Sequence, residues 1–483
     1  MAAQPTITTT MLSNADWASQ DFDERIYARA PNPAEFPETP ETSKSYWIRE
    51  FKIDFEDECT RAPFPTEVDT VIIGSGITGA TVAYQISHAQ PGLRVAMVEA
   101  RGLCTGATGR NGGHIGRPEV YHLRELAAHF GPEEAIKLRQ LGLRNGKMML
   151  EALTELGAIE QTDTRLNGTI VVFETAEERE EFAADLEFAR QQGHRPVGYL
   201  IEAPEVLSKV NIERSKAQHG AAYIERSGTI YPRKFVAALL RDALKRMSGL
   251  TIHAYTPVSS VASDFSAEKY HYTVSTNRGA IKARAVFHAT NGYASHLISA
   301  LTGPTGVYGG KGHMLAVQPN RAAPEECQLQ PGFGYQDFWH WVLQRPNSGP
   351  YLYGLASAEE LGQYNDNITL PDDNENRRKM IKFLETVFPH HFREIDVKRD
   401  VIYDWTGVQG FTHNSASIVG RPNPGSPGEY ASVGHNGEGM GRCFVSATVA
   451  TDALLNYLNG VKDWTPPEWF PEAFARNLGT GDV

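Results

Sequence analysis

The chain is poor in cysteine, in long apolar runs and in positive charge. Its few cysteines lack a CxxC pair and the spacing of metal ligands: Cys59, Cys104, Cys327 and Cys443. This usage argues against a disulfide framework and a metal site, and it favours a reducing compartment. No uninterrupted apolar run approaches the length of a bilayer span. The formal net charge of −12 disfavours nucleic acid as a partner, because a phosphate backbone needs a basic face.

Targeting signals are also scarce. Residues 1–25 lack the basic start and apolar middle of a secretory signal, and they carry acids and almost no arginine, unlike a transit peptide. The final residues, Gly-Thr-Gly-Asp-Val, match no peroxisomal signal. We therefore expect a cytoplasmic protein without a membrane span, whose partners are small molecules.

The most informative stretch is residues 68–100. An apolar, β-branched run leads into Gly74, Gly76 and Gly79 at GxGxxG spacing, and a helical pattern and a second apolar run that ends in Glu99 follow. The first glycine permits a tight turn, the second lets the backbone approach a pyrophosphate, and the third packs helix on strand. Glu99 is placed to accept hydrogen bonds from an adenosine ribose. The whole context predicts a dinucleotide-binding βαβ unit.

Three further stretches place glycines where backbone approaches a ligand. Residues 105–114, TGATGRNGGH, directly follow the adenosine-binding strand, although a flexible surface loop is the alternative for them. Residues 285–297 read as a strand that ends in Ala-Thr-Asn-Gly, and residues 430–455 as a strand, a glycine-rich turn and a helix start. Two glycine-rich helix starts far apart in sequence suit a long, two-ended cofactor.

In this combination the chain resembles the D-amino-acid oxidase superfamily of FAD-dependent oxidoreductases. It is more similar to the branch of glycine oxidase, sarcosine oxidase and γ-glutamylputrescine oxidase than to D-amino-acid oxidase itself. That family joins GxGxxG and a strand-end Glu to an S/T-G-A-S/T-x-R-N-G-G loop, an A-T/N-x-G turn and a G-H-x-G-x-G helix start. All four occur here in order, and the resemblance spans residues 66–460. It implies an α/β fold with a discontinuous Rossmann-type FAD-binding domain and a second, antiparallel-sheet substrate domain.

The resemblance also implies which residues bind FAD. Gly74, Gly76 and Gly79 are expected at the pyrophosphate and Glu99 at the adenosine ribose. The residues along the pyrophosphate, ribityl chain and ring are Thr105, Thr108, Arg110, Asn111, Gly112 and Gly113; Val258 lies beside adenine, and Gly437, Glu438, Gly439 and Met440 lie at the pyrimidine end of the ring. Further expected cofactor residues, without a finer assignment, are Ile77, Thr78, Ala100, Arg101, Gly106, Ala107, His114, Thr290, Asn291, Gly292, Gly407, Gly434 and Asn436.

Some family members attach the flavin covalently through a His or a Cys. Arg110 stands where related dimethylglycine dehydrogenases carry that His, which argues against this route. Cys104 and Cys443 remain alternatives, although a buried inert thiol is the simpler interpretation of each.

The substrate site is expected in the segment FGYQDFWHWVLQRPNSGPYLY. Strand alternation puts Trp339 and Trp341 on one face and His340 on the other. For the tryptophans we favour packing in the core. Tyr335 and His340 are candidate catalytic residues, and Trp405 is a further pocket candidate.

Arg345 is a candidate partner for a substrate carboxylate through a bidentate pair. It directly precedes a proline at a turn, so we favour a solvated surface role instead. The sequence therefore leaves both amino acids and plain amines open as substrates.

Lys311 is the third candidate catalytic residue. The family's oxidases use a buried cation beside the flavin ring to speed electron transfer to dioxygen, where negative charge develops. Lys311 follows a predicted strand that leads back toward the flavin; His114, His313 and His435 are alternatives, and purely structural roles stay open. No residue is assigned to a metal.

The length of 483 residues predicts two domains. We expect an irregular arm over residues 1–65, with Tyr46 and Trp47 docked on the body; an FAD-binding domain from residues 66–160, 223–305 and 400–460; a substrate domain from residues 161–222 and 306–399; and a tail over residues 461–483.

Helical patterns cover 122–157 and 176–192 and begin again at Pro232, after Pro371 and at Arg442; strand patterns cover 68–73, 95–98, 167–174, 250–263, 270–276, 306–317, 339–356 and 429–433.

The leading hypothesis is a flavoprotein of the amine oxidase type. It oxidises the C–N bond of an amine or amino acid by hydride transfer to FAD, with dioxygen as acceptor and an imine and hydrogen peroxide as products. One alternative is an FAD-dependent dehydrogenase that acts on a 2-hydroxy acid or uses another acceptor. Another is a non-catalytic flavin-binding regulatory protein. A dehydrogenase that binds only a nicotinamide cofactor is disfavoured, because it would give residues 105–114 and 434–441 no ligand to contact.

Overall fold

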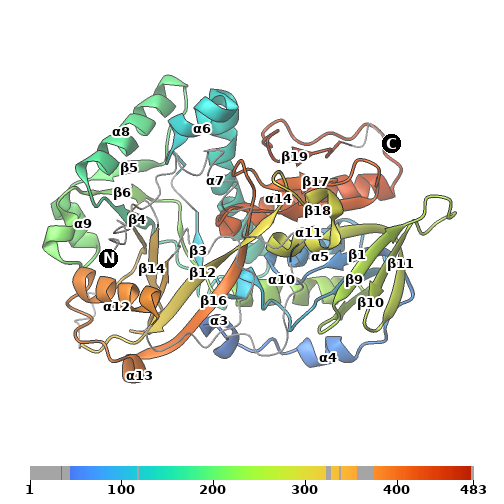
Figure 1. The fold of residues 1–483 in the computed structure, drawn as a ribbon, viewed down its shortest axis with the longest axis horizontal. Helices are drawn as coiled ribbons and strands as arrows, with labels where there is room; N and C mark the ends of the chain where they lie inside the picture. The colour runs from blue at the N-terminus through green and yellow to red at the C-terminus, as the bar shows by residue number, and fades with distance from the viewer. Residues whose placement is uncertain are drawn as a thin grey trace, which may run out of the picture.

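Two large sheets organise the chain. The computed structural model describes Ala34 and residues 44–116, 119–321, 328–336, 339–355 and 374–479. Within these residues the strands form a nine-stranded sheet, an eight-stranded sheet and a two-stranded pair. The nine-stranded sheet and its helices occupy the right half of Figure 1, and most of the eight-stranded sheet lies in the left half. The fold is α/β, as the sequence predicts.

The nine-stranded sheet has the order β19-β17-β18-β11-β1-β2-β8, with β10 paired to β11 and β9 paired to β10. β1 is parallel to β2 and β11, and parallel pairing continues outward to β8 and β18. Its strands are β1 (Glu67–Ile73), β2 (Val95–Val98), β8 (Leu250–His253), β9 (Val258–Ser263), β10 (Tyr272–Thr276), β11 (Gly279–His288), β17 (Ile418–Gly420), β18 (Glu429–Val433) and β19 (Ala475–Arg476).

The parallel centre of this sheet follows from its apolar sequence. Every residue of β2 and β18 is buried, as expected for strands covered on both faces. The strands predicted at 68–73, 95–98 and 429–433 are confirmed. The short strands predicted within 250–263 are β8 and β9, which are separate because the chain turns at Tyr255, whose φ is +52°. The carboxyl ends of the parallel strands meet at one edge, where open α/β sheets bind ligands.

The eight-stranded sheet has the order β16-β12-β15-β14-β13-β4-β6-β5, and only β13 and β4 pair in parallel. β12 and β16 cross the centre of Figure 1. The strand predicted over 339–356 is wrong as one element, since it is the hairpin β14–β15. The strands are β4 (Thr169–Val172), β5 (Gly198–Ile201), β6 (Ala221–Ile224), β12 (Tyr308–Val317), β13 (Gly332–Tyr335), β14 (His340–Gln344), β15 (Tyr351–Leu355) and β16 (Val401–Phe411).

The helices follow the predicted pattern with one break. The helix predicted over 122–157 is two helices, α6 and α7, because Gly131 has a φ of +86° and Pro132 starts a new helix. The described helices are α3 (Tyr46–Arg49), α4 (Glu56–Arg61), α5 (Ile77–Ala89), α6 (Leu123–Phe130), α7 (Pro132–Glu155), α8 (Ala176–Gln191), α9 (Ala203–Lys209), α10 (Pro232–Arg246), α11 (Ala294–Leu297), α12 (Glu375–Val387), α13 (Val397–Asp400) and α14 (Gly439–Leu458). Pro371 lies outside the described residues, although the helix predicted after it is α12.

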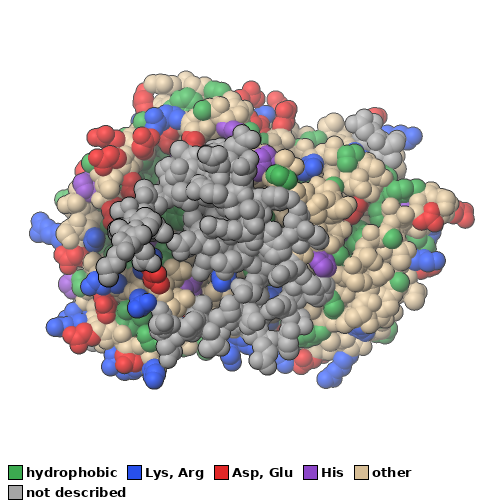
Figure 2. Space-filling view, viewed as in Figure 1, with side chains coloured by type: hydrophobic (Ala, Val, Ile, Leu, Met, Phe, Trp, Pro, Cys, Tyr) green, Lys and Arg blue, Asp and Glu red, His purple; other side chains and the backbone are tan. Residues whose placement is uncertain are grey.

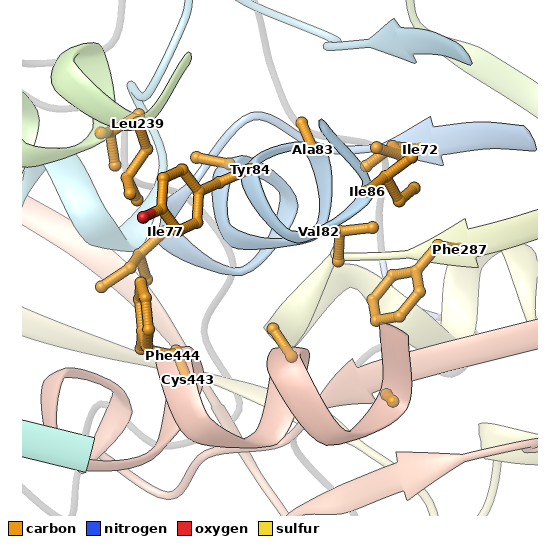
Figure 3. Close-up of a cluster of buried hydrophobic side chains, with 14 of the residues drawn as sticks. Ile72, Ile77, Val82, Ala83, Tyr84, Ile86, Leu239, Phe287, Cys443 and Phe444 are labelled. Atoms are coloured by element: carbon orange, nitrogen blue, oxygen red, sulfur yellow. The ribbon is translucent and has the colours of Figure 1, made fainter. Parts of the chain in front are cut away.

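The main core surrounds α5, which packs on α10 and α14. Figure 3 shows Leu239 of α10 and Phe444 of α14 on either side of α5, while Ile72 of β1 and Phe287 of β11 close the side toward the sheet. None of these four side chains is more than 2% exposed, and burying each stabilises the fold by about 1.5–3 kcal/mol. A second core lies between the eight-stranded sheet and the helices α9 and α12.

The described part of the N-terminal arm is docked on the body. Trp47 is fully buried among Trp405, Met314 and Tyr231, and Tyr46 packs at the edge of the same cluster. This confirms the predicted docking of Tyr46 and Trp47. The rest of the arm before residue 44, apart from Ala34, lies outside the described residues.

The predicted domain boundary at residue 400 places residues 401–411 in the FAD-binding domain, whereas these residues form β16 of the eight-stranded sheet. Residues 401–411 pair with β12 along its whole length in the eight-stranded sheet, and the chain returns to the nine-stranded sheet at β17. The physical reason is that the backbone groups of β12 need a partner strand on this side. The division into an FAD-binding and a substrate domain otherwise stays a prediction.

Around the edge of the face shown in Figure 2, the residues that the structure describes carry charged side chains of both signs, and acidic side chains lie along α8. The acids of this helix are Glu177, Glu178, Glu180, Glu181, Asp185 and Glu187. Within the described ranges, the structure has no helix with both the length and the apolar character needed to cross a bilayer.

The contact between α5 and the turn before it generates a stability prediction. In Gly79→Ala the new Cβ would lie 1.9 Å from the carbonyl oxygen of Gly74 and 3.3 Å from a methyl carbon of Ile72. We expect the free energy of unfolding to fall by at least ~1–3 kcal/mol, the usual cost of overpacking. Chemical denaturation followed by circular dichroism measures this loss.

Gly146→Ala in α7 is the matched control. Its Cβ would meet Ile115 at an ordinary 3.5 Å, so we expect the free energy of unfolding to rise by up to ~1 kcal/mol through helix propensity. A Gly79→Ala protein as stable as the wild type would contradict the packing described here.

Candidate active site

A cavity of about 690 Å³ lies at the carboxyl edge of the nine-stranded sheet, against β12, β14 and β16. Its wall combines the ends of β1, β2 and β11, the loop at 105–114, the start of α14, and side chains from α6 and α7. Gly74 and Gly441, near opposite ends of the chain, thus border the same space.

Most of the predicted cofactor residues converge on this cavity. The ones that line it are Gly74, Gly76, Ile77, Thr78, Glu99, Ala100, Arg101, Gly106, Ala107, Thr108, Arg110, Asn111, Gly112, Gly113, His114, Val258, Thr290, Asn291, Gly292, Gly407, Asn436, Gly437, Glu438, Gly439 and Met440. Gly79, Thr105 and Gly434 do not line it. Gly79 packs on the turn before α5. The carbonyl of Thr105 accepts a hydrogen bond from Arg110 Nε at 2.7 Å, and the N–H of Gly434 donates to Asn291 Oδ1 at 3.1 Å. These three residues shape the wall without reaching the cavity.

Glu99 stands directly after β2 on the cavity wall. Its Oε2 accepts hydrogen bonds from the N–H and the hydroxyl of Ser75, at 2.9 and 2.7 Å, and its Oε1 accepts one from the N–H of Arg101 at 3.1 Å. The turn after β1 therefore fixes the direction of the carboxylate. Oε1 keeps capacity for a further donor, such as a ribose hydroxyl.

Two helix N-termini open onto the cavity. α5 begins after Gly76 and α14 begins after Glu438, and residues 76–78 and 438–440 line the wall. The first N–H groups of a helix have no partner within the helix and carry partial positive charge, so both ends favour an anionic or electron-rich group. The hydroxyl of Thr108 accepts the N–H of Ile77 at 3.0 Å, which ties the loop at 105–114 to the first turn of α5.

Charged side chains in the wall are paired with protein groups. Glu438 forms an ion pair with Arg442 and lies 3.6 Å from Arg139. The Arg110 side chain is buried, and its guanidinium donates to the carbonyls of Thr105 and Thr406 at 2.7 and 2.8 Å. Arg110 thus ties the loop at 105–114 to β16.

His340 and Tyr335, predicted as catalytic residues, do not line the cavity, and these assignments are corrected. Both lie in the layer between the eight-stranded sheet and α12. The His340 ring stacks on Phe383 with centroids 4.3 Å apart, and its Nδ1 bonds the Tyr353 hydroxyl at 2.5 Å. Burial lowers the pKa of His340 to about 4, which keeps the ring neutral. Alternation along β14 turns residue 340 toward α12 and residue 341 toward the cavity.

Trp339 and Trp341, for which the sequence favours the core, line the cavity instead. Trp341 Nε1 donates to the sulfur of Met314 at 3.3 Å, and Met314 lines the cavity as well. A Cβ on Gly112 would lie 2.4 Å from the Trp341 ring, so this glycine is what admits the indole. Trp405, a pocket candidate, is fully buried off the wall, and its Nε1 donates to the carbonyl of Arg110 at 2.9 Å.

Lys311 is the predicted catalytic candidate that the structure does bring to the wall. Its side chain, 8% exposed, lines the cavity from β12. Of the alternatives, His114 and His435 line it too, whereas His313 is bonded to Asp404 at 2.7 Å and does not. Burial lowers the pKa of His435 to about 3, so this ring is neutral near pH 7 and supplies no cation.

Arg345 is buried, contrary to the predicted surface role. It forms an ion pair with Asp163 at 2.5 Å, and its guanidinium carbon lies 5.1 Å from the centroid of the Trp47 ring. Arg345 does not line the cavity, so it is not placed to bind a substrate carboxylate there.

Sequence reasoning missed one side of the wall. The missed residues lie in or beside α6, α7 and β16, and they include Tyr121, His122, Glu125, Leu126, His129, Arg139, Gln409 and His413. No motif spacing marks the residues of α6 and α7, because only tertiary packing brings these helices to the cavity. For β16, the two glycines of TGVQG, Gly407 and Gly410, are a signal of close backbone approach that the prediction used at Gly407 alone.

No group of three or more metal-ligating side chains occurs among the residues that the structure describes. The two cysteines weighed for covalent attachment, Cys104 and Cys443, are both buried, and Cys443 lines the cavity whereas Cys104 does not. Burial raises the pKa of each thiol to about 12. Both therefore stay neutral near pH 7, which supports the interpretation as inert thiols.

Comparison with known proteins agrees with the geometry of this site. A family model described as FAD dependent oxidoreductase matches residues 69–453, which is most of the chain.

Individual proteins are similar along nearly their whole length. A protein named probable oxidoreductase OrdL from Haemophilus influenzae is 22% identical over 436 residues, covering 86% of this chain and 91% of that protein. The crystal structure of glycine oxidase from Geobacillus kaustophilus has a TM-score of 0.64 at 20% identity, covering 86% of this chain and 100% of that one. The structure of L-proline dehydrogenase from P. horikoshii has a TM-score of 0.63 at 20% identity over the same shares. Likeness at this level of identity shows a shared fold.

The burial of Cys104 and Cys443 generates a labelling prediction. Because the thiolate is the reactive form, a thiol whose pKa is about 12 is almost unreactive at pH 7.5. After treatment with N-ethylmaleimide, we expect mass spectrometry to find the peptides of both cysteines unmodified in the folded protein and modified after unfolding in urea. Labelling of either residue in the folded protein, at the rate of a free cysteine, would show that its surroundings are open.

Proposed function

The chain belongs to the family of FAD-dependent oxidoreductases, and from this premise we propose that it binds FAD in the cavity and oxidises the C–N bond of an amine or amino acid, with dioxygen as acceptor. The observation that carries the proposal is the convergence of glycine-rich stretches and two helix N-termini on one cavity that also has an apolar wall.

The order of lining residues along the cavity suits an extended dinucleotide. Val258 and Glu99 form the proposed adenosine end, and residues 74–78, at the start of α5, form the proposed pyrophosphate site. Residues 111–113 and 437–440 form the proposed ring end. Partial positive charge at the start of α5 balances the phosphates, and the start of α14 balances charge on the reduced ring.

The residues present fit such a ligand. The hydroxyl oxygen of Thr290 is buried at the cavity and has no hydrogen-bond partner among the described residues, and a buried polar group needs one. A Cβ on Gly76 would lie 3.1 Å from Thr108 Oγ1, so glycine keeps this approach open for phosphate oxygens. Polar groups therefore lie where a long polar ligand meets them.

When bound, FAD supplies the hydride acceptor, and the chain supplies position and environment. Trp339, Trp341 and Met314 give the proposed substrate side an apolar wall that excludes water. An apolar surrounding lowers the pKa of an amine, because it disfavours the charged ammonium. The neutral amine keeps its lone pair, which assists loss of hydride from the adjacent carbon.

The two neighbouring structures support the substrate class and divide on the acceptor. Glycine oxidase and L-proline dehydrogenase both carry an amino acid in their names, and one is named an oxidase and the other a dehydrogenase. For this chain the buried Lys311 favours dioxygen, because a cation at the wall stabilises the negative charge that develops on oxygen. A dehydrogenase with another acceptor is the second candidate.

The test of this function starts from the spectrum of the purified protein. We expect the yellow absorption of bound flavin, bleached under anaerobic conditions by glycine, sarcosine, proline or a primary amine from a panel. In air the same compound is expected to yield an imine-derived product and peroxide in equal amounts.

Each other outcome has a meaning of its own. Bleaching by a 2-hydroxy acid instead of an amine contradicts C–N oxidation, and bleaching by an amine without peroxide in air assigns another acceptor. Flavin that only a chemical reductant bleaches indicates a regulatory flavoprotein. A protein that remains colourless with added FAD rejects the proposal.

Lys311→Met tests the acceptor. We expect reoxidation of the flavin by dioxygen to slow by about 10²–10³-fold, the usual cost of removing one group that stabilises developing charge, while anaerobic bleaching by the substrate changes little. Stopped-flow absorbance separates the two half-reactions. Lys379→Met, on the outer surface of α12, is the matched control. Equal reoxidation rates for the wild type and Lys311→Met would remove Lys311 from the oxygen reaction.

A further inference from the structure

Three successive carbonyls of the loop at 105–114 are held by side chains from outside the loop. The hydroxyl of Ser45 donates to the carbonyl of Gly109 at 2.5 Å. The indole of Trp405 donates to that of Arg110 at 2.9 Å, and the indole of Trp47 donates to that of Asn111 at 2.6 Å. Two of the donors belong to the N-terminal segment and one to β16.

Holding these carbonyls also fixes the N–H groups beyond them. In a trans peptide the C=O and the following N–H point in opposite directions. The N–H of Asn111 is therefore turned away from Trp405, and the N–H of Gly112 is turned away from Trp47. Asn111 and Gly112 line the cavity, whereas the two tryptophans do not. Among the described residues, none accepts a hydrogen bond from either of these N–H groups.

We propose that Trp47 and Trp405 are positioning residues that present the N–H groups of Asn111 and Gly112 to the flavin and thereby raise its reduction potential. The inference rests on the proposed function, since it places a flavin in the cavity. N–H donors that are already oriented toward the flavin stabilise its electron-rich reduced ring more than its oxidised ring. Because their direction is fixed beforehand, no free energy is spent on reorienting them when the ring is reduced. Residues 45–47, in the described part of the N-terminal segment, are therefore part of the redox site although they do not line the cavity.

Trp47 is itself held firmly enough for this task. It is 0% exposed, and its carbonyl accepts the hydroxyl of Tyr231 at 3.0 Å. The Tyr231 ring meets the indole edge to face, with centroids 4.7 Å apart. On another side the Arg345 guanidinium, paired with Asp163, lies 5.1 Å from the indole. The buried Arg345 thus has a role as support for Trp47 through a cation–π contact.

The experiment compares Trp47→Phe, Trp405→Phe and the double variant with the wild type. Each change keeps an aromatic ring and removes the N–H donor. We expect FAD to dissociate about tenfold more readily from each single variant, as measured by quenching of flavin fluorescence. We also expect the midpoint potential to fall by about 30 mV for each tenfold loss of affinity that affects reduced flavin alone.

Trp464→Phe is the matched control. Its indole donates to Asp452 Oδ2 at 2.8 Å, away from the cavity, so removing this donor is expected to leave both FAD affinity and potential unchanged. Melting temperatures from circular dichroism report any general loss of stability in each variant.

The outcomes separate this inference from the proposed function. A wild-type protein that binds no FAD rejects the function itself. A yellow wild type whose Trp47→Phe and Trp405→Phe variants melt earlier but keep its potential and flavin spectrum shows that the tryptophans are only structural, and overturns the inference. If one tryptophan variant does not fold, the other single variant carries the test: a fall in potential supports the inference, and an unchanged potential overturns it.

Discussion

The turn that ends β1 is in backbone contact with two other elements, and the position of the whole site depends on it. A Cβ on Gly79 would strike the carbonyl of Gly74, and a Cβ on Gly74 would lie 2.6 Å from the carbonyl of Ala289. The start of α5, the end of β1 and the end of β11 are therefore as close as backbones can pack. Because no side chain separates these three ends, none of them can move without displacing the others. The shape of the cavity therefore depends on how the three ends pack.

The eight-stranded sheet supplies the part of the cavity wall that the nine-stranded sheet does not. β12 brings Lys311 and Met314 to the wall, β16 brings residues 407–411, and β14 adds Trp341. Arg110 and Trp405 join the glycine-rich loop to β16 through backbone carbonyls, so the two sheets are linked by hydrogen bonds at the site itself. The parallel strands and helix starts thus supply the glycine-rich part of the wall, and the antiparallel strands supply Lys311, Met314 and Trp341.

Local motifs in the sequence predicted one half of the site well. GxGxxG spacing and strand-end glycines are set by contacts within a few residues, and the residues at 74–78, 106–108, 110–114 and 437–440 do line the cavity. Alternation along β14 correctly predicted that His340 and Trp341 lie on opposite faces of the strand. It does not say which face packs under α12, so the prediction placed His340 in the site in place of Trp341. The burial of Arg345 depends on aromatic rings from residues 46, 47 and 231, which no local pattern connects to it. The break between α6 and α7 was readable from Gly131-Pro132.

The sequence distance across the cavity has a consequence for biosynthesis. β18 and the start of α14 are translated long after β1 and α5, yet β18 lies in the sheet beside β11, and α14 lines the cavity at its start and packs on α5. While the ribosome still holds these residues, the nascent chain exposes an unpaired strand edge and an apolar helix face. The wall of the cavity is therefore complete only after residues 437–443 have left the ribosome.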